Sequence, residues 1–331
     1  SANQLINQMN PLALNPSLVQ QIHECAIQAA RAGGAKIREG AQRRNELLIE
    51  HKRLNDLVSA VDRLSEAVIV DTILQAFPSH SILAEEGSGN PQERERAFRW
   101  IIDPLDGTTN FLHGFAHYAV SIGVQHQGEM VVAVVYDPIK EHLFEAIRGA
   151  GARLNGRPIR VAQRSGLCEA LVSTGLPYPT ATDAPIYFRI LEQVWQGCRN
   201  VRRPGAAALD LAYVAAGFTD GFFETGLSPW DVAAGSLLVT EAGGLIGNFT
   251  GESDFLEQKE CLAGAPRIYG QLVSILGKFS KFASAGDKAA VRSAVETLSR
   301  ERASDRDEPE PEAEAAADAA EGSEQPKDAP F

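Results

Sequence analysis

The 331-residue sequence lacks any uncharged apolar run of about 18 residues, the length that a helix needs to cross a bilayer. Its first residues also lack the basic start and the apolar stretch of a secretory signal. Motifs typical of nucleic-acid-binding modules are missing as well. We therefore expect a cytoplasmic protein with no membrane contact and no direct nucleic-acid motif.

Cysteine is scarce, and the four cysteines lie far apart at Cys25, Cys168, Cys198 and Cys261. The sequence has no CxxC pair and no cysteine–histidine cluster with zinc-finger spacing. Scattered cysteines of this kind are typical of reduced thiols in a cytoplasmic protein. The cysteines therefore argue against a disulfide framework, a thiolate metal site or a redox role.

Positive charge is also in short supply, and the formal net charge of the chain is −12. Residues 301–331 hold eleven Asp or Glu and only three Lys or Arg, so −8 of that charge belongs to this tail. The tail is also poor in apolar residues and rich in Pro, Glu and Ala, which predicts disorder for residues 281–331. Its acidity argues against nucleic-acid binding by the tail.

The first half of the chain predicts helices followed by an antiparallel sheet. Helical spacing of apolar residues follows Pro16-Ser17 and is predicted to end at Gly33-Gly34, and a second helix is predicted from Asp62 to the residue before Pro78. Two strands that each end in carboxylates come next, SILAEE and RAFRWIID. Period-two alternation then predicts an antiparallel meander with the strands AVSIGV, MVVAVVYD, HLFEAIR and PIRVA.

The second half alternates between strands and helices. Strands are predicted at ALVSTG, DGFFET and LIGNF, and helices at 186–195, AALDLAYVAAG and 230–242. Sheets covered by helices predict a layered α/β (α+β) fold. We expect three parts. The first is an α+β half over residues 1–160, which carries the carboxylates proposed below to bind metal. A mixed α/β half over 161–280 follows, and then the disordered acidic tail over 281–331.

Two aspartates mark the most informative segment, WIIDPLDGTTNF. Asp103 is predicted to end a strand and Pro104 to force a turn, so that Asp103 and Asp106 converge at the end of that strand. The glycine and threonines that follow could present backbone N–H groups to a phosphate oxygen. The same letters also suit an ordinary surface turn, and that alternative stays open for the motif taken alone.

Further carboxylates follow other predicted elements. Glu85-Glu86 ends the preceding strand, and Asp231 begins a helix, where it could serve simply as an N-cap. Asp62 has the same N-cap alternative. The candidate ligands are then four carboxylates, Glu85, Asp103, Asp106 and Asp231. Four oxygen donors without His or Cys partners suit a hard cation such as Mg²⁺. Two such ions roughly 3.5–4 Å apart could bind the attacking water and the leaving alkoxide in phosphoryl transfer.

With these residues in place, the sequence resembles the inositol monophosphatase family. WIIDPLDGTTNF matches the first signature of the family, and WDVAAGSLLVTEAGG, residues 230–244, matches the second. The resemblance covers roughly residues 15–275 and is strongest to the bacterial, extragenic suppressor type. It implies an αβαβα sandwich like that of the inositol monophosphatases and fructose bisphosphatases.

The resemblance also implies roles for individual residues. Two or three Mg²⁺ ions would be held by Glu85, Asp103, the carbonyl of Leu105, Asp106 and Asp231. Water activated by the metal would be oriented by Glu85 and by Thr108 paired with Asp62. Substrate contacts would come from Glu85, Leu105, Asp106, Gly107, Thr108, Gly205, Ala206, Ala207, Glu224 and Asp231. Lys52 resembles a lysine on a mobile loop of the family, and Ala206 stands where relatives often carry Ser or Thr.

The resemblance implies a Mg²⁺-dependent phosphomonoesterase that hydrolyses inositol monophosphate, is inhibited by Li⁺ and forms a homodimer. Another small sugar or polyol phosphatase on the same fold is the alternative within the enzyme class. Bacterial relatives are also associated with transcription antitermination on ribosomal RNA operons, so a non-catalytic adaptor that binds antitermination proteins is the alternative outside that class.

Overall fold

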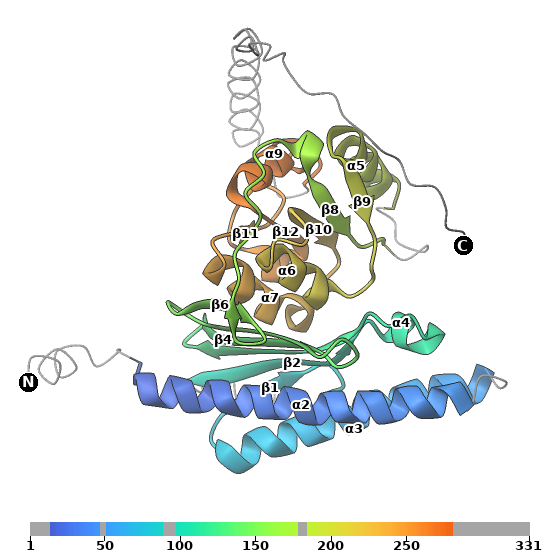
Figure 1. Cartoon of the computed structure of the whole chain (residues 1–331), viewed down its shortest axis with the longest axis vertical. Coiled ribbons are helices and arrows are strands. Elements are labelled where there is room, and N and C mark those ends of the chain that lie inside the picture. Colours follow the sequence, from blue (N-terminus) through green and yellow to red (C-terminus); the bar gives the residue numbers. More distant parts are fainter. Residues whose placement is uncertain (1–13, 47–50, 89–96, 178–183, 281–331) are drawn as a thin grey trace, which may run out of the picture.

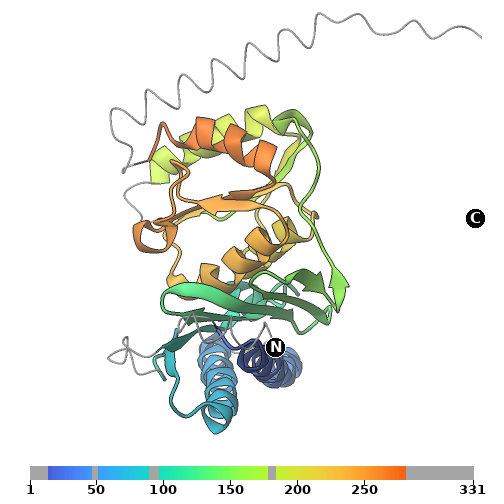
Figure 2. The same cartoon turned by 90° about the vertical axis from the view of Figure 1, so that its left-hand side faces the viewer.

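The computed structural model describes residues 14–46, 51–88, 97–177 and 184–280, and its elements form five layers (Figure 1). Helices α2 (Pro16–Glu46) and α3 (His51–Ala76) form the first layer. A seven-stranded sheet, the helices α6 and α7, a five-stranded sheet and the pair α5 and α9 follow in turn, as the turned view also shows (Figure 2). The predicted αβαβα sandwich is confirmed.

The first sheet runs in sequence order, from β1 to β7. Its strands are β1 (Ser81–Ala84), β2 (Phe98–Asp106), β3 (Ala119–His126), β4 (Glu129–Asp137), β5 (His142–Ile147), β6 (Gly151–Leu154) and β7 (Arg157–Pro158). Only β1 and β2 pair in parallel, and the rest form the predicted meander. The predicted strand PIRVA is wrong, because the chain pairs through β6 and leaves the sheet after Pro158.

The second sheet has the order β11-β12-β10-β8-β9. Its strands are β8 (Leu171–Thr174), β9 (Asn200–Arg202), β10 (Gly221–Thr225), β11 (Leu245–Gly247) and β12 (Glu260–Gly264). The helices of this half are η1 (Leu167–Glu169), α5 (Ala184–Gly197), α6 (Ala207–Ala215), α7 (Pro229–Glu241), α8 (Phe255–Gln258) and α9 (Pro266–Leu276). Strands β9 and β12 and helices α8 and α9 were not predicted from the sequence.

Helices α6 and α7 are buried between the two sheets, and one apolar core includes side chains of both sheets and both helices, among them Phe144, Leu211, Leu238 and Phe222. A second core joins α2 and α3 to the outer face of the first sheet.

The division of the chain near residue 160 stays a prediction, and the predicted disorder of 281–331 lies outside the described residues. Among the described helices, none combines the length and the apolar character needed to cross a membrane.

The first helix is longer than predicted, because Gly33 and Gly34 lie inside it and do not end it. A Cβ atom on Gly33 would collide with Ile69 and Ser65 of α3, and one on Gly34 would collide with the ring of Tyr136 in β4. The two glycines therefore allow α2 to approach α3 and the sheet closely. Close packing outweighs the cost of about 1 kcal/mol for glycine in a helix.

Candidate metal centre and active site

Strand β2 carries three of the predicted metal ligands on an irregular end: the carboxylates of Asp103 and Asp106 and the carbonyl of Leu105. It does not stop at Asp103 as predicted; it continues through Pro104 to Asp106, and the pairing with β3 shifts register between the two aspartates. The Asp103 carboxylate accepts the N–H of Leu105 at 2.9 Å, and Ser65 of α3 donates its hydroxyl to the Pro104 carbonyl at 2.9 Å. The bulge turns both carboxylates toward α7.

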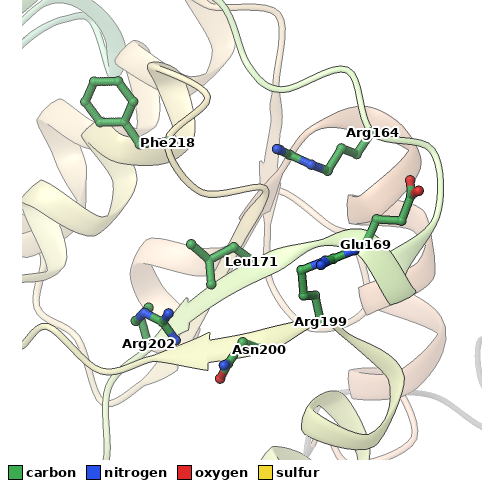
Figure 3. A pocket seen from close by; sticks show the side chains of 7 residues that line it. All are labelled: Arg164, Glu169, Leu171, Arg199, Asn200, Arg202 and Phe218. Atoms are coloured by element: carbon green, nitrogen blue, oxygen red, sulfur yellow. The ribbon is translucent and has the colours of Figure 1, made fainter. Parts of the chain in front are cut away.

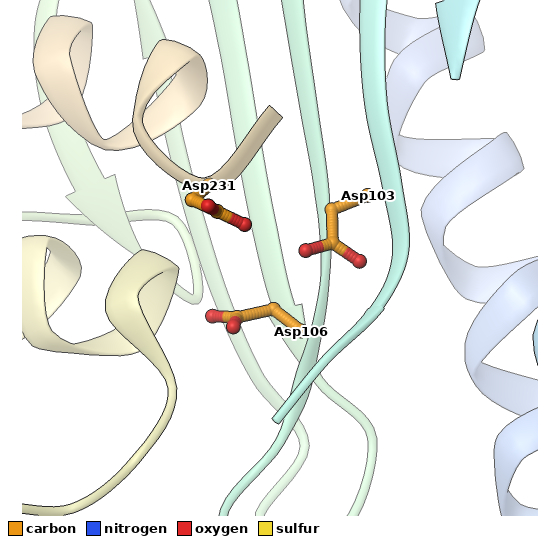
Figure 4. Close-up of side chains that lie close together, drawn as sticks. All are labelled: Asp103, Asp106 and Asp231. Carbon is orange, nitrogen blue, oxygen red and sulfur yellow. The ribbon is translucent and has the colours of Figure 1, made fainter. Parts of the chain in front are cut away.

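Asp231 completes a group of three carboxylates (Figure 4). One oxygen from each of Asp103, Asp106 and Asp231 lies within 4.8 Å of the others. Asp231 is the third residue of α7, so the N-cap alternative is wrong; Ser228 is the N-cap and donates its N–H to the Asp231 carboxylate at 2.7 Å. Residues about 125 positions apart thus meet where β2 and α7 face each other.

Each of the three carboxylates is oriented by one backbone N–H group. Leu105 donates to Oδ1 of Asp103, Ala208 donates to Oδ2 of Asp106 at 2.7 Å, and Ser228 donates to Oδ2 of Asp231. One oxygen of each carboxylate is therefore held by the backbone. Asp103 also shares side-chain hydrogen bonds with Asp231 and with Glu85, so the oxygens that the backbone does not hold lie close to one another.

The electrostatics of this group fit a bound cation. Burial, followed by mutual repulsion, raises the pKa of Asp103 and of Asp106 well above the ordinary range, and burial also raises the pKa of Asp231. In the described part of the chain, none of the three forms an ion pair with a basic side chain. Clustered oxygen donors without a basic partner suit a hard divalent ion such as Mg²⁺.

Glu85 lies at the rim of this group, on an exposed loop after β1. Its pKa is raised, first by desolvation and then by the neighbouring acids, and its carboxyl shares a hydrogen bond with Asp103. The loop is held by a residue that the sequence analysis missed. Both oxygens of the fully buried Glu66 accept backbone N–H groups at 2.8 Å, from Glu86 and from Ser88.

Asp62, Ser65 and Glu66 occupy one face of α3, at positions i, i+3 and i+4. Since α3 begins at His51, Asp62 lies inside the helix, and the N-cap alternative is wrong. Burial, Glu86 and Glu85 raise the pKa of Asp62 to about 8. The spacing of Ser65 and Glu66 from Asp62 was visible in the sequence and could have identified them. Lys52 lies in α3, but its side chain is outside the described structure.

The predicted phosphate loop begins at Gly107, which precedes helix α4 (Thr108–His113) with a left-handed φ of 92°. A Cβ here would collide with the carbonyl of His117 and with the Cβ of Ala206, so only glycine allows this approach. The Thr108 hydroxyl donates to the Leu105 carbonyl at 3.1 Å, and its pairing with Asp62 stays a prediction.

Gly205, Ala206 and Ala207 reach the centre from the second half of the chain, at the start of α6. Asn110 of α4 holds this segment: its amide contacts the carbonyls of His117 and Pro204 at 2.8 Å each, and of Gly205 at 3.3 Å. Asn110 was not predicted as a site residue, although it belongs to the motif WIIDPLDGTTNF. Its contacts connect the two loops expected to bind substrate.

Glu224 is the next-to-last residue of β10, a strand that contacts α6. Burial, followed by repulsion from Asp231, raises the pKa of Glu224 to about 8, while Arg203 opposes the shift. Asp210 of α6 is fully buried, and burial followed by repulsion from Glu224 raises its pKa well above the ordinary range, while a hydrogen bond with Ser173 opposes the shift. Asp210 was also missed by the sequence analysis.

A separate hollow of about 530 Å³ lies at the edge of the second sheet (Figure 3). It is lined by Arg164, Glu169, Leu171, Arg199, Asn200, Arg202 and Phe218. Arg164 pairs with the buried Asp220, with 3.0 Å between Nη1 and Oδ1. Because its charged groups are mainly guanidinium ions, this hollow does not suit a divalent cation.

Comparison with known proteins agrees with this geometry. The Inositol monophosphatase family model matches residues 18–280. The chain is 46% identical over 243 residues to the Nus factor SuhB of Escherichia coli K12, an alignment that covers 73% of this chain and 91% of the relative.

Two crystallised relatives share the fold. The extragenic suppressor protein SuhB of Bartonella henselae has a TM-score of 0.70 and 38% identity, over 78% of this chain and 99% of that chain. The inositol monophosphatase of Anabaena (Nostoc) sp. PCC 7120 has a TM-score of 0.71 and 37% identity, over 80% of this chain and 98% of that chain. From its two signatures, its layered fold and these matches, the chain is a member of the inositol monophosphatase family.

Proposed function

We propose that this protein is a Mg²⁺-dependent phosphomonoesterase that hydrolyses inositol monophosphate to inositol and phosphate. The observation that carries the proposal is the group Asp103, Asp106 and Asp231: three carboxylates without a basic partner in the described structure, each oriented by a backbone N–H. Such an arrangement is costly unless a cation neutralises it. Membership of a phosphatase family supports the same conclusion.

The residues that would hold two or three Mg²⁺ ions are Glu85, Asp103, the carbonyl of Leu105, Asp106 and Asp231. When bound, Mg²⁺ lowers the pKa of water and neutralises charge on phosphate oxygens. Glu85, at the exposed rim, would accept a proton on its carboxylate from the attacking water as the P–O bond to the alcohol breaks, and the departing alkoxide would take a proton from another water. Thr108 and Asp62 orient that water from the side of α3.

The phosphate group is expected to bind the backbone N–H groups of Gly107 and Thr108. The sugar-like part would then extend toward Gly205, Ala206, Ala207 and Glu224. Glu224 is not a proposed metal ligand, but Asp231 contributes to its raised pKa, so its carboxylate lies near the metal group. It can accept a hydrogen bond from a substrate hydroxyl.

The first experiment measures phosphate release from inositol 1-phosphate, with Mg²⁺ or with EDTA. The wild type should be active only with Mg²⁺ and should be inhibited by Li⁺, and Asp106→Asn should be inactive. Asp71→Asn is the matched control, because Asp71 is an exposed carboxylate of α3 that is not a proposed site residue. Full turnover in EDTA would rule out the proposed chemistry.

Phosphate release from another sugar or polyol phosphate, with none from inositol 1-phosphate, would favour the alternative substrate class.

A non-catalytic role is a second candidate, because the E. coli relative is named a Nus factor. In that role the chain, expected to be a homodimer, would bind proteins of a ribosomal RNA antitermination complex. Asp106→Asn separates the two roles, since it should abolish hydrolysis and leave the binding of such proteins unchanged.

A further inference from the structure

We propose that Gly175 is a specificity-determining residue, because its missing side chain creates the space that the Glu224 carboxylate occupies. The inference rests on the proposed function for its substrate, a phosphate ester whose alcohol carries neighbouring hydroxyls. Gly175 lies outside both family signatures and does not belong to the predicted site residues.

The contact between the two residues follows from the register of the second sheet. Strands β8 and β10 are parallel neighbours, with Thr174 opposite Phe223, so the next residues along, Gly175 and Glu224, also lie side by side. A Cβ atom on Gly175 would overlap the carboxyl carbon and both oxygens of Glu224. Alanine at 175 and the present position of this carboxylate therefore exclude each other.

The backbone of Gly175 is firmly held, so the side chain of Glu224 is the part that would move. The Thr174 hydroxyl contacts the carbonyls of Phe223 and Gly175 at 2.7 and 3.1 Å, and the hydroxyl of Tyr187 at 2.6 Å. Both Thr174 and Tyr187 are buried. The φ angle of Gly175 is not in the left-handed region, so alanine fits this backbone without strain.

The neighbours of Glu224 define what a displacement would change. Burial and Asp231 raise its pKa and Arg203 lowers it, so its carboxylate interacts with both the metal group and a basic side chain. The metal carboxylates themselves are held by N–H groups of Leu105, Ala208 and Ser228, and the atoms nearest to a Cβ on Gly175 all belong to Glu224. Moving Glu224 should therefore alter substrate recognition while the metal group stays in place.

The test compares Gly175→Ala with the wild type on two substrates in saturating Mg²⁺. For inositol 1-phosphate, kcat/KM should fall at least about tenfold, the loss expected when a hydrogen bond to a charged group is removed. For p-nitrophenyl phosphate, whose alcohol carries no further hydroxyl, kcat/KM should stay within about twofold. Equal losses on both substrates, or no loss on either, would overturn the proposal.

Two further variants control for a general structural effect. Gly270→Ala adds the same methyl group inside helix α9, where nothing lies within 4 Å, and should leave both substrates unaffected. In Glu224→Ala the carboxylate is already absent, so adding Gly175→Ala should cause no additional loss. An additive loss in the double variant would contradict a shared mechanism.

A crystal structure of Gly175→Ala decides the geometric claim without any activity. Displacement of the Glu224 carboxylate with an unchanged backbone at Thr174 supports the proposal. An unchanged carboxylate overturns it, even in an active enzyme. If the wild type hydrolyses neither substrate, the proposed function fails, and this structure still decides whether Gly175 positions Glu224.

Discussion

The two sides of the metal centre are built differently. Asp103, Asp106 and Asp231 come from a strand and a helix that pack against each other, and each carboxylate is held by a backbone N–H. Glu85 lies on an exposed loop whose position depends on the carboxylate of one buried side chain, Glu66. The first side is therefore preorganised by packed elements of the fold. The second is an exposed loop, in which the N–H of Glu85 bonds the Ile102 carbonyl and the two Glu66 bonds hold the residues that follow.

The largest effect is expected from the preorganised side. Asp103→Asn removes a negative oxygen from the three-carboxylate group, so kcat should fall by about a thousandfold or more, in line with the loss of a key electrostatic group. In EDTA the melting temperature should not fall, because the variant relieves repulsion among buried acids. Activity assays and thermal melts with and without Mg²⁺ check both. A variant that melts much earlier in EDTA would contradict this account.

Glu66→Gln tests the loop side and should have a smaller, different effect. The amide can accept only one of the two N–H bonds, and its NH₂ group would face the other donor. A charge-assisted hydrogen bond is worth about 1.5–3 kcal/mol, so the Mg²⁺ concentration for half-activation should rise about tenfold or more. At saturating Mg²⁺, kcat should recover to within about threefold.

Glu39 is an exposed carboxylate on α2 that pairs with Lys36. Glu39→Gln is therefore the matched control for Glu66→Gln and should change neither the Mg²⁺ concentration for half-activation nor kcat. An unchanged half-activation concentration in Glu66→Gln would show that the loop is held by other contacts. A loss of kcat that excess Mg²⁺ does not restore would show that the two sides of the centre are not separable in this way.

The contrast between the two sides also explains which residues could be predicted from sequence. Asp103, Asp106 and Asp231 stand in long signatures, so the resemblance identifies them although no local rule places Asp231 beside β2. Glu66 and Asn110 act through backbone groups of distant segments, and such contacts depend on tertiary packing that periodicity does not report.

The same limit applies to the fold. Alternation and apolar spacing predicted strands β3, β4 and β5 of the meander and helices α5, α6 and α7 of the second half. Gly33-Gly34 gave a false helix end because glycine also serves close packing, and only the positions of Ile69 and Tyr136 decide between these uses. The short edge strands β7 and β9 have too few residues for a period-two pattern.

A moderate effect is expected from pH in the metal-free protein. The pKa of Asp62 and that of Glu224 are each raised to about 8, whereas in an unfolded chain such groups titrate near pH 4. Between about pH 4 and 8 the folded state therefore binds more protons, and the free energy of unfolding should fall as pH rises.

Thermal melts in EDTA at pH 5, 6.5 and 8 measure this slope, which Glu224→Gln should reduce. Adding Mg²⁺ should raise the melting temperature more at pH 8 than at pH 5, because protons compete with the ion for the carboxylates. A melting temperature in EDTA that rises from pH 5 to pH 8 would show that these acids are ionised in the folded protein.

The smallest effect is expected from the acidic tail, which lies beyond both sides of the centre in the sequence. The family match ends at residue 280, and both cores and every proposed ligand precede that point. We expect the −8 charge of residues 301–331 to act on the site only through solvent, where salt screens it within about 10 Å. Deleting residues 285–331 should therefore leave kcat, KM and the melting temperature nearly unchanged at 0.1 M salt, and a large change in any of them would mean that the tail contacts the folded part.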